Sequence, residues 1–187
     1  FRGNEMMAAF ARAQLAKLPA RTRAAQENAA RFAAALEELP GLRAQRIPDD
    51  RQSVHHKLRI FFDGAEAGVD LPPRELRDAL KAALTAEGAN CVLWQDHALP
   101  EHPLFTRFEG FGGGWPFRLA EDPEALRASY DPANFPRTRA LLDGSVVLFS
   151  QTRPLIAQTP ETVDRYAEAL RKVWTHRSQL VEIAAEL

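Results

Sequence analysis

The side chains able to act in acid–base or metal chemistry are few and scattered along this sequence. Its five histidines include the adjacent pair His55-His56, inside the run SVHHKLRIFFD, and also His97 and His102, each preceded by a carboxylate. The last two lie near prolines, a setting typical of exposed loops. The histidines, aspartates and glutamates show no metal-ligand spacing, and no HExxH motif occurs. The sequence therefore predicts no metal site and no catalytic residue within this chain.

Nucleophile and phosphate-binding motifs are missing from the sequence as well. Cys91 is the single cysteine, which excludes an internal disulfide and a cysteine-based zinc site, and we expect it to be buried in a strand. No Gly-x-Ser-x-Gly motif occurs. The glycine-rich stretch 110–114 follows no predicted strand and opens no predicted helix, so it lacks the context of a phosphate loop. A flexible, aromatic surface loop fits this stretch better.

His56 stands out by its position in a pattern. From Val54 to Phe62, apolar residues at every second position predict a strand over Ser53–Asp63, with His56 on its apolar face. A histidine in such a place is more often a hydrogen-bonded core residue than a functional one. The pattern alone leaves both alternatives open.

Composition places the chain among ordinary globular domains. Its 187 residues, 45% apolar and 26% charged, fit one domain or one domain with an extension. The formal net charge of −1 gives no electrostatic reason to expect a nucleic acid or an anionic membrane as partner. Apolar runs are only a few residues long, so no bilayer span is predicted. With a single cysteine, these features point to the cytoplasm.

The opening of the chain predicts two consecutive helices. Asn4 is a good N-cap for the first helix. One face of that helix is apolar and comprises Met7, Phe10, Ala11, Leu15 and Leu18. Pro19 is expected to end it and to occupy the first turn of a second helix over Arg21–Leu39. Small inner residues suit packing of these helices on each other or on a partner subunit. Gln14, in the middle of the apolar face, needs a hydrogen-bond partner unless it lies at the rim.

The rest of the chain alternates strands and helices. Strands are predicted at Leu42–Ile47, at Ser53–Asp63, from Cys91 to Trp94 and at Ser145–Ser150. Helices are predicted at Arg74–Ala86 and after Thr159-Pro160, where Thr159 is the N-cap, with a kink or second short helix near His176. The fold class is therefore α+β, with a small antiparallel or mixed sheet flanked by helices. Residues 95–134 carry prolines and aromatic residues and predict a long loop.

The opening stretch FRGNEMMAAFARAQLAKL resembles a segment of the DegT/StrS sugar aminotransferases, where Gly-x-Asn-[Tyr/Phe]-Arg precedes a helix ending in Ala-x-x-x-x-Gln-Leu. Phe1-Arg2 matches the end of that motif, and Gln14-Leu15 matches its Gln-Leu pair. Further similar stretches follow in the family's order: Arg23 and Ala30, SVHHK at 53–57 for a Ser-x-x-His strand, Pro-x-x-Pro-Leu-Phe at 100–105, glycines before Trp115-Pro116, SVVLFS at 145–150, and Lys172-Val173.

The resemblance implies the C-terminal small domain of a pyridoxal-phosphate enzyme with the aspartate aminotransferase fold (fold type I), plus the long helix leading into it. We therefore expect residues 1–40 to form helical lead-in and interdomain helices. Residues 41–187 are expected to form the small domain, with an aromatic and proline-rich loop at about 95–134. The motif begins at Phe1 without an initiator methionine, so we expect the second half of a larger enzyme, inactive alone.

Three residues receive roles from the resemblance. Arg2 matches an arginine that reaches into the partner's active site, where a guanidinium suits the cofactor phosphate or an anionic substrate. His56 matches a histidine lying near the substrate, and Trp94 lies where family members shape substrate entry. The lysine that binds pyridoxal 5'-phosphate and the aspartate paired with its ring nitrogen have no counterpart here. Gly3-Asn4 departs from the more usual Met-[Ser/Thr].

The implied activity is a ping-pong amino transfer from glutamate or glutamine to a keto-sugar or keto-cyclitol, in a homodimer with shared active sites. Two alternatives stay within the family: a sugar dehydratase, with histidine in place of the upstream lysine, and a regulatory paralogue that binds pyridoxal phosphate. A third alternative is a non-enzymatic α+β interaction module without a cofactor.

Overall fold

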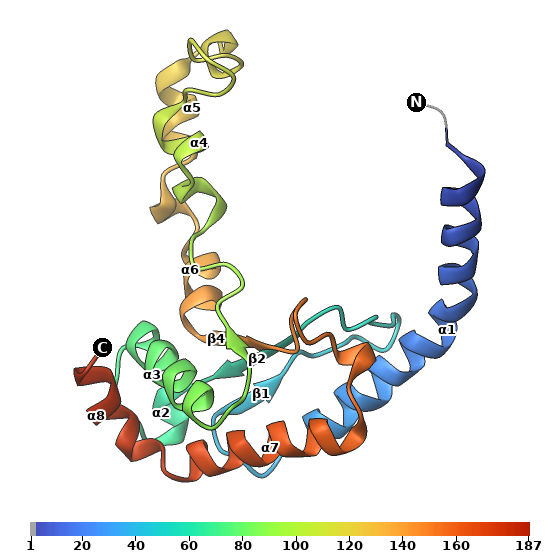
Figure 1. The fold of residues 1–187 in the computed structure, drawn as a ribbon. Coiled ribbons are helices and arrows are strands. Elements are labelled where there is room, and N and C mark those ends of the chain that lie inside the picture. The colour runs from blue at the N-terminus through green and yellow to red at the C-terminus, as the bar shows by residue number, and fades with distance from the viewer. Residues whose placement is uncertain (1–2) are drawn as a thin grey trace.

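A single long helix, α1 (Glu5–Ala34), opens the computed structural model, which describes residues 3–187. Asn4 caps it as predicted, because its side-chain oxygen accepts a hydrogen bond from the Met7 backbone nitrogen at 2.8 Å. The predicted stop at Pro19 is wrong, since Pro19 lies inside the helix. A proline removes one backbone donor and crowds the preceding turn, which a helix can tolerate by bending. Figure 1 shows that α1 curves along its length.

Four short strands form one antiparallel sheet in the order β1-β2-β4-β3. Their bounds are β1 (Leu42–Ala44), β2 (Leu58–Phe62), β3 (Cys91–Val92) and β4 (Ser145–Leu148). β4 lies inside the sheet and is buried throughout, as its apolar sequence predicts. On β2, Leu58, Ile60 and Phe62 are buried and face the hydrophobic core.

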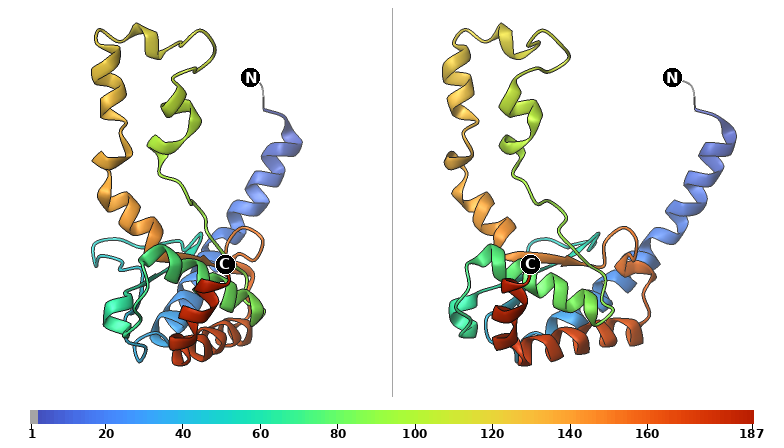
Figure 2. Two further views of the ribbon diagram at one scale, coloured as in Figure 1. Left: turned by 90° about the vertical axis from the view of Figure 1, so that its left-hand side faces the viewer. Right: turned by 60° about the vertical axis from the view of Figure 1, so that its left-hand side comes forward.

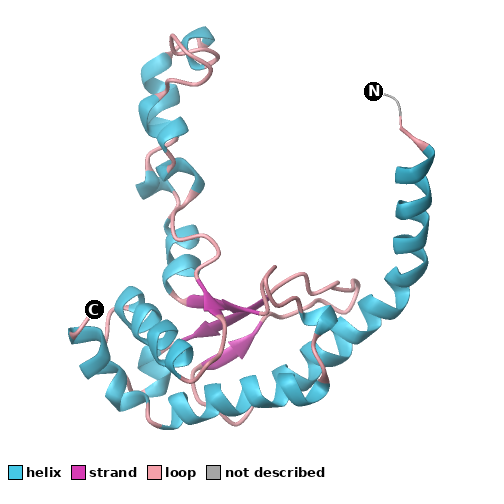
Figure 3. Cartoon of the chain, viewed as in Figure 1, coloured by secondary structure: helices cyan, strands magenta, loops and turns pink. Residues whose placement is uncertain are grey.

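Helices cover the core face of this sheet. They are α3 (Pro73–Ala86), α7 (Pro160–Thr175) and the C-terminal half of α1, with the shorter α2 (Gly64–Ala67) and α8 (Leu180–Ala185) beside them. Figure 3 shows α7 and the end of α1 on one side of the sheet, while the N-terminal half of α1 rises on the other side. Thr159 caps α7 as predicted. The predicted second short helix near His176 is also confirmed, as η5 (Arg177–Gln179) followed by α8.

Asn28 ties α1 to the segment before α7. This buried side chain donates from Nδ2 to the carbonyl oxygens of Leu155 at 3.1 Å and Gln158 at 3.0 Å. Leu155 begins the 3₁₀ turn η4 (Leu155–Ala157). A buried amide satisfied by two carbonyls fixes the relative positions of the elements that it joins.

The predicted strand over Ser53–Asp63 is too long at its start. β2 begins only at Leu58, and His55 has a left-handed backbone conformation with φ of 46°. The alternation of residue types continues through 53–57, but these residues have no strand partner. The expectation that His56 shares the buried face is therefore wrong, because His56 is exposed and lies outside the strand.

Residues 95–143 form a projection that we call the arm. Instead of one structureless loop, the arm contains η1 (Leu99–Glu101), α4 (Pro103–Arg107), η2 (Phe117–Leu119), α5 (Pro123–Ser129), η3 (Pro132–Asn134) and α6 (Pro136–Asp143). Figure 2 shows it standing away from the sheet as two adjacent limbs. Aromatic pairs join the limbs: the ring centroids of Phe105 and Tyr130 are 4.9 Å apart, and those of Phe108 and Tyr130 are 5.9 Å apart.

Cys91 lies in β3 and is buried, as predicted. Burial in apolar surroundings raises the pKa of its thiol to about 12. Over residues 3–187, no helix combines the length and the apolar character that a membrane crossing would require.

Candidate functional site

The face of the sheet turned away from the core carries the most distinctive side chains. Because residues alternate along a strand, Arg59 and Phe61 of β2 point away from the face that holds Leu58 and Ile60. Both side chains are only partly buried. In the strand register Arg59 lies opposite Val147, and Phe61 lies opposite Ser145. We call this side of the sheet the open face.

Arg59 is held in place on the open face by a hydroxyl group. Its Nη1 donates to Ser145 Oγ at 2.7 Å, and the same hydroxyl donates in turn to the Leu141 carbonyl oxygen in α6. Burial lowers the pKa of the Arg59 guanidinium from its ordinary value. The side chain is thus fixed, partly desolvated and charged.

Lys57 lies near this arginine, and Trp94 lies against Lys57. The Lys57 ammonium sits over the Trp94 ring, with Nζ 2.9 Å from the ring centroid, in the geometry of a cation–π contact. The pKa of Lys57 is lowered, first by desolvation and then by the nearby charge of Arg59. We call Lys57, Arg59 and Trp94 the basic patch. It combines two positive charges with one aromatic face.

The predicted site residues are brought together only in part. Trp94 belongs to the basic patch, whereas His56 lies in the bend just before β2 and is exposed. Its neighbour His55 is the more enclosed of the two, since it lines a cavity of about 220 Å³ that also involves Gln26 of α1. Burial lowers the pKa of His55. Arg2 lies outside the described residues.

Lys57 and Arg59 were missed as site residues by sequence reasoning. The available signal was their spacing, because Lys57 and Arg59 alternate with the apolar set in the strand predicted over Ser53–Asp63, although only Arg59 lies within β2. That signal indicates a positively charged sheet face, but it does not identify Trp94 or Ser145 as neighbours. Those contacts come from parts of the chain far from β2.

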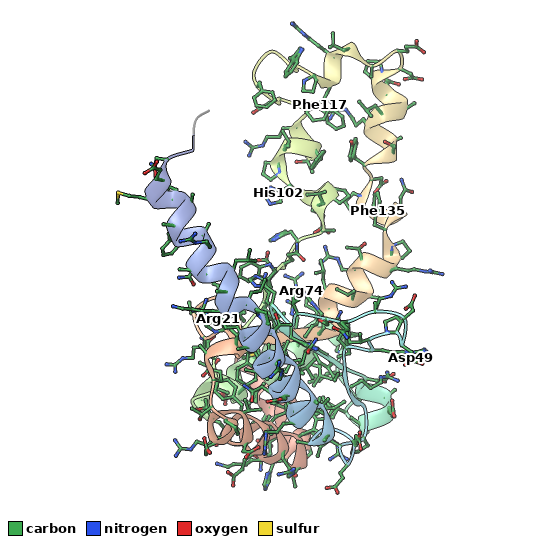
Figure 4. The ribbon with its side chains drawn as sticks, turned by 90° about the vertical axis from the view of Figure 1, so that its right-hand side faces the viewer. Arg21, Asp49, Arg74, His102, Phe117 and Phe135 are labelled. Carbon is green, nitrogen blue, oxygen red and sulfur yellow. The ribbon has the colours of Figure 1, made fainter. Side chains whose placement is uncertain are left out.

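The N-terminal half of α1 presents an apolar stripe that residues 3–187 do not cover. Met7, Phe10 and Leu15 have exposed fractions of 64%, 63% and 66%. Gln14 is satisfied within the helix, because its Oε1 accepts from Arg21 Nη1 at 2.8 Å. The prediction that two helices meet here is replaced by one helix whose first half packs on no other described element of the chain. Figure 4 shows Arg21 on α1 standing apart from His102, Phe117 and Phe135 on the arm.

Ion pairs fix the arm to the domain at its root. Arg139 of α6 pairs with Glu101 and, at 3.5 Å, with Asp143. Asp143 also pairs at 3.3 Å with Arg77 of α3, whose side chain is only 4% exposed. The Arg139 guanidinium holds the pKa of Glu101 below its usual value. In the described part of the chain, no group of three or more histidine, cysteine, aspartate or glutamate residues could hold a metal ion.

The architecture is a small antiparallel sheet backed by helices, with a long leading helix and a basic open face. A family model described as the DegT/DnrJ/EryC1/StrS aminotransferase family matches residues 1–111. The chain belongs to the DegT/DnrJ/EryC1/StrS aminotransferase family, and the predicted resemblance is confirmed.

Two individual proteins are also similar to this chain. Protein MosB of Rhizobium meliloti is 27% identical over 140 residues, which is 73% of this chain and 24% of MosB. The crystal structure of 3-amino-5-hydroxybenzoic acid (AHBA) synthase superposes with a TM-score of 0.58 at 23% identity, covering 89% of this chain and 37% of that one. This likeness confirms the predicted α+β fold. The chain thus spans 24% and 37% of the lengths of these two relatives.

Proposed function

We propose that this chain is the C-terminal portion of a pyridoxal-phosphate-dependent aminotransferase that moves an amino group from glutamate or glutamine to a keto-sugar or keto-cyclitol. In this proposal residues 1–40 are the lead-in and interdomain helix, and residues 41–187 are the small domain. The family match over residues 1–111 is the observation that carries the proposal. We further propose a cytoplasmic homodimer with shared active sites, and the uncovered stripe on α1 is consistent with a surface that another part of such an assembly covers.

The described residues fit the substrate side of such an enzyme better than its cofactor anchor. Pyridoxal phosphate supplies an electron-withdrawing ring and a carbonyl group that carries nitrogen between substrates. Its covalent anchor would be a fully enclosed lysine, and none of the chain's four lysines is one: Lys17 is exposed on α1, Lys81 is only half-buried on α3, Lys57 lies on Trp94, and Lys172 pairs with Glu87 at 2.8 Å. We therefore assign the anchoring lysine and the ring-nitrogen aspartate to sequence upstream of this chain. Arg2 is our proposed contact to the phosphate in the partner's site.

Two described residues are proposed to serve the substrate. His56 is exposed in the bend that precedes β2, where an imidazole can exchange a proton with a substrate hydroxyl or carboxyl group. Trp94 presents a planar apolar wall at the point where the chain leaves β3 for the arm. A wall of this kind excludes water from one side of a bound substrate and limits its orientation.

Borohydride trapping tests the proposal directly. Full-length protein is mixed with pyridoxal phosphate, reduced and mapped by mass spectrometry, and an adduct is expected on one lysine upstream of this chain. Amino transfer is then measured as 2-oxoglutarate release from glutamate with keto-sugar acceptors. Absence of both the adduct and the transfer contradicts the proposal. A cofactor bound without an adduct, at a site where histidine replaces the lysine, would favour the dehydratase alternative.

Variants within this chain test the proposed substrate contacts. His56→Ala is expected to raise KM or lower kcat by about tenfold or more, the scale of one positioned proton-transfer group. His176→Ala is the matched control, since His176 is an exposed histidine at the end of α7, on the core-covering side. Equal kinetics of the two variants would remove His56 from the site.

A further inference from the structure

The basic patch has no counter-charge among the described residues. No carboxylate oxygen of residues 3–187 lies within the 4.0 Å ion-pair distance of the Lys57 ammonium or the Arg59 guanidinium. Arg77, which is buried, and Arg139, which is about one third exposed (35%), each pair with carboxylates. The patch differs from these two arginines, while the half-buried Arg177 has two carbonyl oxygens as partners in place of a carboxylate.

Two unneutralised charges side by side are unfavourable without an anion. Arg59 is partly desolvated, and an ion loses hydration free energy when it is buried without a partner. Lys57 stands close enough to Arg59 for the two charges to repel. A bound oxyanion would relieve both effects at once, because it supplies opposite charge and accepts the free N–H groups.

Both cations are already held in position. Arg59 Nη1 is occupied by Ser145 Oγ, which leaves the remaining guanidinium donors for a ligand. Lys57 rests over Trp94, so its ammonium is confined while its three donors stay available. Side chains fixed before the ligand arrives lose little conformational entropy on binding. The patch therefore has the donor set and the preorganisation of an anion subsite.

The subsite lies where a substrate would reach it. Figures 1 and 2 show the arm and the N-terminal half of α1 rising on the side of the sheet opposite α7, which is the side of the open face. Trp94 of the patch is followed directly by the arm, and Ser145 directly follows the segment that returns from the arm to the sheet. The patch is thus placed at the base of the arm.

We propose that Lys57 and Arg59 form a binding subsite for an oxyanion of the substrate, a carboxylate or a phosphate group. This assignment rests on the proposed function, because it takes the open face to be the face that meets the substrate. It narrows the substrate class to amino donors or acceptors that carry a negative charge at the end bound by this domain. Trp94 acts in the subsite as a positioning residue that holds the Lys57 ammonium.

Anion titration tests the subsite without requiring catalysis. Full-length protein is titrated calorimetrically with inorganic phosphate and, separately, with glutarate, at constant ionic strength. The variants are Arg59→Gln, Lys57→Met and the double variant, with Arg165→Gln as control because Arg165 is exposed on α7, away from the open face. Each single variant is expected to raise the Kd of the anion that binds through the patch by about tenfold or more, the scale of one charged hydrogen bond. The control variant is expected to leave this Kd unchanged.

The two anions separate the two ligand sources. Loss of phosphate binding alone assigns the subsite to a phosphate group, and loss of glutarate binding alone assigns it to a carboxylate. Binding of both anions that is equal in all variants, or binding of neither anion by the unaltered protein, overturns the proposal. If Arg59→Gln does not fold, Lys57→Met and the charge-preserving Arg59→Lys carry the same comparison. If an anion binds through the patch in a protein that gives neither the lysine adduct nor amino transfer, the proposed function is overturned and the subsite stays in place.

Discussion

Replacing Asn28 should selectively loosen the contact between α1 and the segment before α7. In Asn28→Ala, the carbonyl of Gln158 loses the amide that now donates to it at 3.0 Å. The Leu155 carbonyl loses one donor but keeps the backbone N–H of Gln158, at 3.2 Å. One orphaned acceptor costs about 1–3 kcal/mol, and one lost hydrogen bond costs about 0.5–1.5 kcal/mol. Because water can partly reach this edge of the contact, we expect a loss near the lower end, about 2 kcal/mol.

Hydrogen exchange measures this loss locally, so that unfolding of other domains does not obscure it. In the full-length protein, peptides covering the end of α1 and residues 154–160 should open more readily in Asn28→Ala. A loss of about 2 kcal/mol corresponds to roughly thirtyfold faster exchange, provided that exchange reports the opening equilibrium. Peptides of the arm should exchange at an unchanged rate.

The arm supplies the matched control for this experiment. Asn134 also donates from Nδ2 to a backbone carbonyl, that of Ala128 at 2.9 Å, but it is exposed. Asn134→Ala should therefore change the free energy of local opening by less than about 0.5 kcal/mol in every peptide, as expected for a surface site. If Asn28→Ala and Asn134→Ala show the same small effect, the reasoning that the buried amide holds α1 in place is refuted.

Three further predictions concern the core and the base of the arm. Leu80→Ala, at a fully buried position of α3, should lower the free energy of local opening of α3 by about 2–5 kcal/mol. Leu104→Ala, at an exposed position of the arm, should be nearly neutral. Hydrogen exchange of the peptides that contain these residues measures both losses, and equal losses would contradict the prediction. Trp174→Phe removes the hydrogen bond that Trp174 Nε1 donates to the Pro40 carbonyl oxygen at 2.8 Å, and it should lower the calorimetric melting temperature by a few degrees. An unchanged melting temperature would show that water replaces this hydrogen bond. Glu101 has a lowered pKa in the folded arm, so its pair with Arg139 should stabilise the arm fully above the unfolded pKa near 4.5. That stabilisation should be lost as pH falls through the folded pKa. Hydrogen exchange of the arm, corrected for the intrinsic effect of pH, should therefore become faster across this range in the native protein but not in Glu101→Gln.

Local signals predicted those elements that depend on local interactions. Asn4 and Thr159 were identified as helix caps because a capping side chain satisfies backbone donors only a few residues away. Short apolar runs predict β3 and β4, because a strand that is buried on both faces is mostly apolar along its length. The continuation of α1 through Pro19 was not predictable from the proline rule, which treats a break as the usual outcome.

The start of β2 depends on its partner and could not be located from its own sequence. β2 pairs with β4 up to Leu58 opposite Leu148, so Lys57 would next face Phe149. Phe149 instead adopts a left-handed conformation, with φ of 52°, and leaves the ladder. The alternation that predicted strand through residues 53–57 therefore continues past the last available partner.

The composition of the site illustrates the same limit. Trp94 is predicted by the family resemblance, and His56 by both the alternating pattern and the resemblance. Arg59 required knowledge of the strand face and of Ser145, which is 86 positions away. The stripe on α1 was correctly seen as apolar, but its exposure in this chain follows from tertiary structure. Periodicity indicates which residues share a face, but it does not indicate what covers that face.

The buried Cys91 has a practical consequence for measuring movement of the arm. Its enclosed, protonated thiol should be inert toward maleimide and nitroxide reagents at neutral pH, and the chain has no other cysteine. A Phe111→Cys variant at the end of the arm would then offer the one reactive thiol in this chain, because Phe111 is 88% exposed. Adding Met7→Cys on α1 would place a second label on the other projection. The chain is therefore suited to spectroscopic distance measurement between the arm and α1, with and without substrate.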